Sequence, residues 1–168
     1  MGEKVENDRE GEEYTRAELV GVYGVVVRSG GAEYSQGAVM LLKGEDWEKQ
    51  ILPIYIGRSE AESIARAFYG VPTQRPMTHD LIVSILGALG VRVERITIDA
   101  LINNVYTATI VLLHEENSRV RRYYIDARPS DSVAIAVRTG APIYVNRQLR
   151  KYAQSESSFT DADTPYER

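Results

Sequence analysis

The sequence lacks cysteine altogether and contains only two histidines, His79 and His114. The first absence excludes disulfide bonds, thiolate nucleophiles and zinc sites built from cysteine. Two histidines are also too few to suggest a structural zinc site. The candidates for chemistry are therefore carboxylates, arginines and the histidines themselves.

Long apolar runs are missing as well. No stretch approaches the roughly 20 residues that a membrane-spanning helix needs, and residues 1–13 are acidic rather than typical of a signal sequence. We therefore expect a soluble, cytoplasmic protein with no membrane partner.

Lysine is scarce: only four of the 20 basic residues are lysine, and the net charge is −4. The negative balance argues against non-specific binding to polyanions, although it says little about a local patch. Arginine suits bidentate phosphate contacts, but it equally suits the ion-pair networks of a heat-stable protein.

Length and composition favour one domain with loose ends. A chain of 168 residues, 43% of them hydrophobic, can bury one sizeable core. Residues 1–17 are charged and residues 154–168 are polar, both without periodicity, so we expect flexible arms around a domain at 18–153. Exposed apolar and tyrosine-rich strands in so small a domain predict a homo-oligomer, most simply a dimer.

The stretch from Tyr123 to Val145 is the most informative part of the chain. It begins with aromatic and β-branched residues that indicate a strand, and Pro129 breaks that strand. Ser130 and Asp131 then suit a helix N-terminus. Residues 133–137 are apolar on nearly every side, which predicts a short helix buried in a core.

An earlier stretch repeats this pattern. Ser59-Glu60 and Ser130-Asp131 are 71 positions apart, and the two Gly-x-Pro ends at 70–72 and 140–142 are 70 apart. The spacing predicts a duplicated strand–helix unit, although convergence on good helix starts would give the same signs. The expected fold is α+β, a single domain with a mixed or antiparallel sheet, in which the two units superpose.

The remaining elements follow from periodicity. Helical spacing of apolar residues after Thr78 predicts a helix that Thr78 caps and Gly90 ends. Asn103-Asn104 tolerates positive φ and so predicts a tight hairpin. Pro53 places its strand at an edge or its start. The other expected strands cover residues 19–28, 38–42, 51–56, 91–101 and 105–113.

Three segments together resemble the bifunctional nuclease family, long catalogued as a domain of unknown function. They are Leu52–Gly57 with Glu60-Ala61, Arg75–Leu81, and Ile125–Asp131 with Ala141–Ile143. The resemblance spans about Glu18 to Tyr152 and implies a compact α+β domain, with activity on both RNA and DNA as reported for plant members. It supplies no established catalytic residues, and Asn103-Asn104 departs from the Asp-Gly more usual at that hairpin.

A phosphodiesterase commonly needs carboxylates for Mg²⁺ or Mn²⁺, a group that transfers protons, and a cation for the phosphate. The candidate catalytic residues are His79, Asp126, Arg128 and Asp131. The candidate metal ligands are Asp126, Asp131 and Glu60, with Asp99 as a further oxygen donor, and no organic cofactor is expected. The candidate substrate-binding residues are Arg75, Arg119 and Arg121, the last two on the same strand face as Tyr123.

Each candidate also has a purely structural reading. Glu60, Asp80 and Asp131 stand where helix starts favour acidic residues, and Arg128 could simply pair with Asp126 or Asp131. Charges on an exposed strand also keep it soluble. At the level of function, a divalent-metal nuclease acting on nucleic acid therefore competes with a non-catalytic module that binds protein or nucleic acid. If the Arg75–Asp80 loop folds against the Asp126–Asp131 segment, a metal or phosphate pocket would form. The residues that would then converge are His79, Arg128, Asp126 and Asp131.

Overall fold

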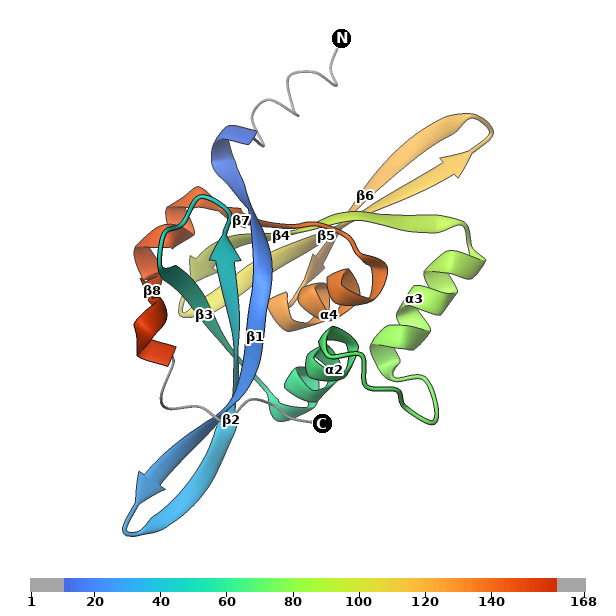
Figure 1. Ribbon diagram of the computed structural model, residues 1–168. Helices are drawn as coiled ribbons and strands as arrows, with labels where there is room; N and C mark the ends of the chain where they lie inside the picture. Colours follow the sequence, from blue (N-terminus) through green and yellow to red (C-terminus); the bar gives the residue numbers. More distant parts are fainter. Residues whose placement is uncertain (1–10, 160–168) are drawn as a thin grey trace.

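The computed structural model describes residues 11–159 as an α+β fold built on one mixed sheet (Figure 1). The sheet has eight strands in the order β6-β5-β4-β7-β1-β2-β3-β8. β4 and β7 run parallel, and the other neighbouring strands run antiparallel. The α+β fold class expected from the sequence is confirmed.

The strands are β1 (Tyr14–Ser29), β2 (Ala32–Gly44), β3 (Gln50–Ile56), β4 (Val91–Ile102), β5 (Val105–Glu116), β6 (Arg119–Ala127), β7 (Ile143–Asn146) and β8 (Gln154–Ser155). The α-helices are α2 (Arg58–Phe68), α3 (Thr78–Ala88) and α4 (Pro129–Thr139). Two 3-10 helices follow β7 and β8, η1 (Arg147–Tyr152) and η2 (Glu156–Phe159).

The duplication predicted from the sequence is visible in the topology. Three consecutive antiparallel strands lead into α2 in the first half, and three more lead into α4 in the second. In each half one residue, Gly57 or Arg128, separates the last strand from the helix. β7 lies between β1 and β4 and so joins the two halves into one sheet.

The main core lies between this sheet and the helices. Ile64 of α2 and Val133 of α4 are fully buried with strand residues such as Leu42 and Ile98. The apolar sequence of α4 predicted burial, and seven of its residues are buried. Because α2 and α4 also contact each other, their first turns come close together.

Hairpin turns follow the expected backbone chemistry. Both residues of Asn103-Asn104 have positive φ, as do both residues at Gly30-Gly31 and at Asn117-Ser118. Two-residue turns of this kind match the twist of the strands they join. Pro53 pairs only with β2, since β8 reaches β3 only at Gln50 and Ile51. The predicted edge position of Pro53 is therefore confirmed.

The helices begin earlier than the sequence pattern predicted. The N-cap residues are Gly57, Met77 and Arg128, so the prediction that Thr78 and the serines cap these helices is wrong. At α2 and α4 the N-cap accepts no hydrogen bond through a side chain, because glycine has none and arginine carries only donors. The physical reason for the early start of α4 is Pro129, whose fixed φ suits the first helical position.

The ordered part of the chain extends beyond the expected limits of 18 and 153. Residues 14–17 begin β1 and pair with β7, so this part of the predicted arm is a strand. Gln154 and Ser155 pair with β3, and Phe159 packs against a second, smaller apolar cluster. The rest of the predicted arms, residues 1–10 and 160–168, lies outside the described residues. Within 11–159 no helix has the length and apolar character to cross a membrane.

Candidate functional site

The first turns of α2, α3 and α4 meet around a pocket of about 280 Å³. Its lining includes Ser59, Glu60, Ser63, His79, Arg128 and Asp131. These residues come from three separate parts of the sequence, so the convergence that the sequence left conditional does occur for His79, Arg128 and Asp131.

Arg128 joins two carboxylates at this pocket. Its Nε donates to Asp131 Oδ2 at 2.9 Å, and its Nη2 donates to Asp131 Oδ1 at 3.3 Å. Its Nη1 also donates to Glu60 Oε1 at 3.3 Å. Gly57 leaves room for this placement of Glu60, because a Cβ at residue 57 would make the flexible end of the Glu60 side chain shift. One guanidinium therefore neutralises part of the charge of two acidic residues from different helices.

His79 bridges the same carboxylate to a buried hydroxyl. Its Nε2 lies 2.8 Å from Asp131 Oδ1, and its Nδ1 lies 2.6 Å from Ser63 Oγ. Ser63 Oγ also accepts a hydrogen bond from Arg138 Nη2 at 3.0 Å, which leaves its own proton for Nδ1. We therefore assign the neutral ring a proton on Nε2 that it donates to Asp131.

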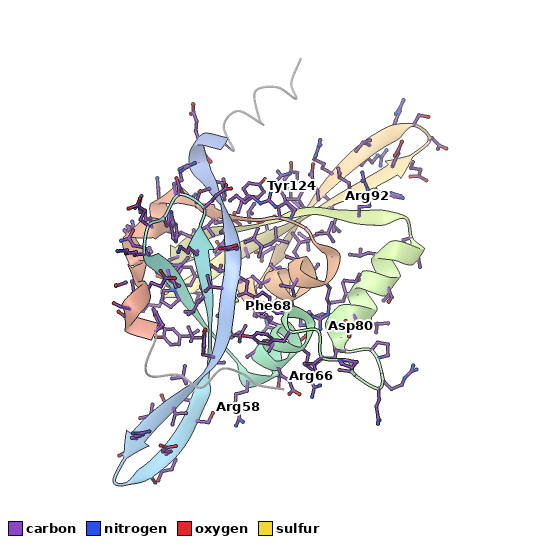
Figure 2. All side chains as sticks on the ribbon, viewed as in Figure 1. Arg58, Arg66, Phe68, Asp80, Arg92 and Tyr124 are labelled. Carbon is purple, nitrogen blue, oxygen red and sulfur yellow. The ribbon has the colours of Figure 1, made fainter. Side chains whose placement is uncertain are left out.

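Behind Ser63, Arg138 anchors the network inside the fold. Its side chain is only 7% exposed, and its Nε donates to Asp80 Oδ1 at 2.6 Å. Nη2 additionally donates to the Ser63 carbonyl at 3.1 Å. Asp80 in turn accepts from the N-cap N–H of α3 at 2.8 Å, and Figure 2 shows Asp80 on the side of α3 that faces the other helices. Arg138 thus fixes α3 against α2 and α4.

These partners hold both aspartates in the charged form. Burial of Asp131 opposes its ionisation, but the hydrogen bonds from Arg128 and His79 outweigh burial and lower the pKa of that carboxyl below its usual range. The hydrogen bond from Arg138 lowers the pKa of Asp80. By formal count, with histidine taken as neutral, the two carboxylates and the one guanidinium at the pocket sum to one negative charge.

The helix starts add positive potential to the same place. Glu60, Asp80 and Asp131 all occupy the third position of their helices. No N-cap side chain accepts a hydrogen bond from the first turn of α2 or α4. Unpaired first-turn N–H groups and the positive end of the helix dipole attract anions. The pocket therefore combines acidic side chains with two helix ends that favour a phosphate.

Asp126 lies away from this pocket. It pairs with Thr109, while its neighbour Ile125 pairs with Ile110 of the main core. Because neighbouring residues of a strand face opposite sides of the sheet, Asp126 faces away from the helices. The expected convergence of Asp126 with His79 therefore does not occur.

Asp99 lies on that same far face and has structural partners. Its carboxylate accepts hydrogen bonds of 2.7–2.8 Å from the hydroxyls of Tyr14, Thr97 and Thr109. Burial, reinforced by the hydrogen bond to Asp99, raises the pKa of Tyr14. Three hydroxyl donors satisfy this carboxylate across three strands of the sheet.

The predicted substrate-binding arginines are also outside the pocket. Arg75 is exposed in the loop before α3 and does not line the pocket. Arg119 and Arg121 share one face of β6, as alternation predicted, but near its beginning. Arg121 precedes the end of β6 by six residues, a distance of about 20 Å in a strand. A substrate would have to be long to touch both places.

The donor set limits how a metal ion could bind. Among residues 11–159, no three His, Asp or Glu side chains come together as a metal cage. Glu60 and Asp131 do share one guanidinium at the pocket. Two carboxylates suit a magnesium or manganese ion that keeps waters and takes its other ligands from substrate phosphates.

A second pocket of about 280 Å³ lies elsewhere, with Glu94, Arg95 and Tyr144 in its lining. Glu94 Oε2 forms ion pairs with Arg95 Nη1 at 2.7 Å and with Arg122 Nε at 3.1 Å. Among residues 11–159, no histidine borders this pocket. The candidate site is therefore the pocket at the three helix starts.

Sequence reasoning missed Ser63 and Arg138. Ser63 follows Ser59 by four residues and Glu60 by three, so all three share one face of α2. That polar stripe on one face of α2 could have indicated from the sequence that Ser63 belongs with Ser59 and Glu60. Arg138 is the one basic residue of α4 and directly follows its apolar run, which was a signal in the sequence. Its side-chain partners Asp80 and Ser63, however, lie 58 and 75 positions away.

Comparison with known proteins places this geometry in context. Residues 40–158 match the family model described as the bifunctional nuclease domain. An uncharacterised protein of Mycobacterium tuberculosis is 42% identical over 117 residues, which cover 70% of this chain and 67% of that protein. Bifunctional nuclease 2 of rice is 28% identical and bifunctional nuclease 1 of Arabidopsis thaliana 27% identical. The aligned parts cover 66% and 70% of this chain but only 34% and 36% of those plant proteins.

Proposed function

Because the chain belongs to the bifunctional nuclease domain family, we propose that it cleaves phosphodiester bonds of RNA, DNA or both at the pocket where α2, α3 and α4 begin. The observation that carries the proposal is the contact chain from Arg128 through Asp131 and His79 to Ser63. It joins a cation, a carboxylate, an imidazole and a hydroxyl within one small pocket. Groups of these kinds can transfer protons and stabilise developing charge during phosphodiester hydrolysis.

In the proposed reaction, His79 acts as a base through Ser63. An attacking water passes a proton to Ser63 Oγ while the Ser63 proton moves to His79 Nδ1. The imidazolium that forms is stabilised by the Asp131 carboxylate at Nε2. The water oxygen bonds to phosphorus, the bond from phosphorus to the sugar oxygen breaks, and the proton held by His79 returns to that oxygen. Ser63 is buried at 3% exposure but borders the pocket, from which the attacking water would reach its Oγ.

Arg128 has the second role, binding the phosphate. Its side chain is 65% exposed, so it can turn from the carboxylates toward a substrate without leaving a buried position. When Arg128 donates its hydrogen bonds to a phosphate instead, Glu60 and Asp131 lose their cation. We propose that Mg²⁺ or Mn²⁺ carried by the substrate then binds these two carboxylates, where it would stabilise charge that develops on the phosphate.

The test is cleavage of end-labelled single-stranded RNA and DNA by purified protein, with Mg²⁺, Mn²⁺ or EDTA. His79→Ala should reduce cleavage at least tenfold, or about 1.4 kcal/mol of barrier. His114→Ala is the matched control, because His114 lies in β5, away from the pocket, and should cleave as the wild type does. Equal cleavage by both variants would mean that a contaminating enzyme or another site is responsible.

A chain that binds the labelled RNA or DNA without cleaving it under any metal condition would support the interaction-module reading instead. Loss of cleavage in EDTA, with recovery on adding Mn²⁺ or Mg²⁺, would support the metal part of the proposal. Unchanged cleavage in EDTA would leave the nuclease proposal standing and remove the metal. We also propose a cytoplasmic location, which fractionation of the source cells would test.

A further inference from the structure

Helix α3 is apolar, yet it is poorly covered by its own chain. Residues 81–91 contain no charged side chain. Within α3 and the residue after it, four large aliphatic side chains are well exposed: Leu81 at 53%, Ile82 at 37%, Ile85 at 49% and Leu89 at 64%. A helix that is apolar on most sides is normally buried. Something outside the described chain should therefore cover this face.

Contacts within the chain are confined to one side of the helix. Val83 packs against the main core, His79 is buried, and Asp80 pairs with Arg138. Figure 1 shows α3 at the rim of the molecule, with α4 and α2 on one side of it. The exposed aliphatic residues occupy the other side, and we call Leu81, Ile82, Ser84, Ile85, Ala88 and Leu89 the α3 face.

We propose that the α3 face binds the α3 face of a second copy of this chain and forms a two-fold symmetric dimer. The shape of the face supports this partner. Leu81, Ile85 and Leu89 form a ridge at i, i+4 and i+8, and the smaller Ser84 and Ala88 form a groove beside it. Ridges and grooves of this spacing on two helices interlock at a crossing angle near −50°. A face that carries both features fits an identical copy.

The chain's own terminal segments do not suit this face. Residues 1–10 and 160–168 are dominated by charged and polar residues. Their larger apolar side chains are Met1, Val5 and Tyr166. Three such residues at two distant ends of the sequence do not match a continuous stripe of four aliphatic side chains.

The charges around the face also favour a second copy. A membrane surface or a nucleic acid would require Lys or Arg beside the apolar stripe, and α3 contains no basic residue other than the buried His79. A two-fold axis perpendicular to the two helices places them in opposed directions, so that each helix dipole meets the opposite end of the other. No like charges meet within residues 81–91, because that segment is uncharged.

Light scattering on the full chain at tens of micromolar tests the proposal. The wild type should have twice the 18.8 kDa chain mass. Ile85→Glu places a charge in the centre of the face and should weaken association at least about thirtyfold, giving a monomer. Ile102→Glu is the matched control, since Ile102 is 57% exposed at the end of β4, and it should remain dimeric. A monomeric wild type, or equal behaviour of the two variants, would overturn the proposal.

Cross-linking gives a result that does not depend on a disruptive variant. Because the chain has no cysteine, Ser84→Cys introduces a single thiol beside the expected crossing point. Mild oxidation should link two chains, whereas Ser29→Cys, at the end of β1 on a hairpin, should link few. Equal linking by both cysteines would count against the α3 face. Binding of a monomeric wild type to anionic vesicles would overturn the proposal too, because a lipid surface would then cover the face.

Discussion

The two halves of the molecule share a fold but differ at the positions that make the pocket. Glu60 and Asp131 occupy equivalent third positions in α2 and α4, 71 residues apart. The equivalent N-cap residues are Gly57 in the first half and Arg128 in the second. The glycine leaves room for Glu60, and the arginine reaches both carboxylates. The pocket thus depends on a difference at the N-cap between two units of the same topology.

A second pair of differences lies deeper in the same helices. When the two units are aligned, Ser63 of α2 is equivalent to Ala134 of α4, and Ala67 is equivalent to Arg138. Arg138 donates to the Ala134 carbonyl at 3.0 Å as well as to Ser63. Each half therefore supplies one polar residue where the other has alanine. The acidic third position is common to both units, whereas the N-cap residue, Ser63 and Arg138 differ between them.

The largest effect should come from the buried arginine. Arg138→Ala removes a buried guanidinium that donates to the Ser63 hydroxyl and to the carbonyls of Ser63 and Ala134, and loss of these charge-assisted hydrogen bonds should cost about 3 kcal/mol of unfolding free energy. Arg66→Ala removes the basic residue in the last turn of α2, which is exposed and pairs with Glu62 at 3.1 Å. Its cost should stay below about 0.5 kcal/mol. Urea unfolding of both variants measures the difference, and equal costs would contradict the anchoring role of Arg138.

A smaller effect, on activity rather than stability, should follow from making the second N-cap resemble the first. Arg128→Gly should reduce cleavage about thirtyfold, or about 2 kcal/mol of barrier, because the phosphate loses its cation. Glycine is tolerated at an N-cap, so the melting temperature should change little. Arg75→Gly serves as the control, since Arg75 does not line the pocket. A loss of cleavage as large in the control would place phosphate binding in the loop before α3.

The smallest effect should be the acid dependence of the Asp80–Arg138 pair. The folded-state pKa of Asp80 is lowered, so its contribution is fully present above the unfolded pKa of about 4 and is lost as the pH falls through the folded pKa. The Asp80 side chain is 38% exposed, so solvent screening keeps this contribution below about 1 kcal/mol.

Unfolding of wild type and Asp80→Asn from pH 7 to pH 3 checks this dependence. The difference in unfolding free energy should be constant above about pH 5 and should shrink below about pH 4. A difference that grows as the pH falls would have the wrong sign.

The sequence predicted the repeat, the fold class and most of the strands because these follow from local patterns. Hydrophobic periodicity and the Gly-x-Pro helix ends can be recognised from a few neighbouring residues. The Asn103-Asn104 turn follows from the backbone preference of asparagine alone. The helix starts were misplaced because Gly57 and Arg128, neither a preferred side-chain cap, occupy the N-cap positions. Because the fixed φ of proline suits the first helical position, α4 begins at Pro129, and Ser130 lies inside the helix instead of capping it.

The site could be predicted only where residue type was itself informative. His79, Arg128 and Asp131 were named because an imidazole, a guanidinium and a carboxylate are groups that phosphate chemistry can use, although acidic residues also suit helix starts for structural reasons. Asp126 was named for its residue type too, but which side of the sheet a strand residue faces depends on the register of strand pairing. Its pairing with Thr109 turns it to the far face, and that pairing depends on contacts 17 residues away. The partners of Arg138 could not be predicted from local sequence either, because they lie 58 and 75 positions away.

The most direct test of the account compares two aspartates five positions apart. Asp131→Asn and Asp126→Asn make the same chemical change on opposite sides of the sheet. Cleavage of labelled RNA and DNA should be measured per folded molecule, with the folded fraction taken from thermal unfolding of each variant. The account predicts that Asp131→Asn loses cleavage at least tenfold, or about 1.4 kcal/mol of barrier, while Asp126→Asn stays within about twofold of the wild type. Normal cleavage by Asp131→Asn, or the larger loss in Asp126→Asn, would contradict a site at the three helix starts.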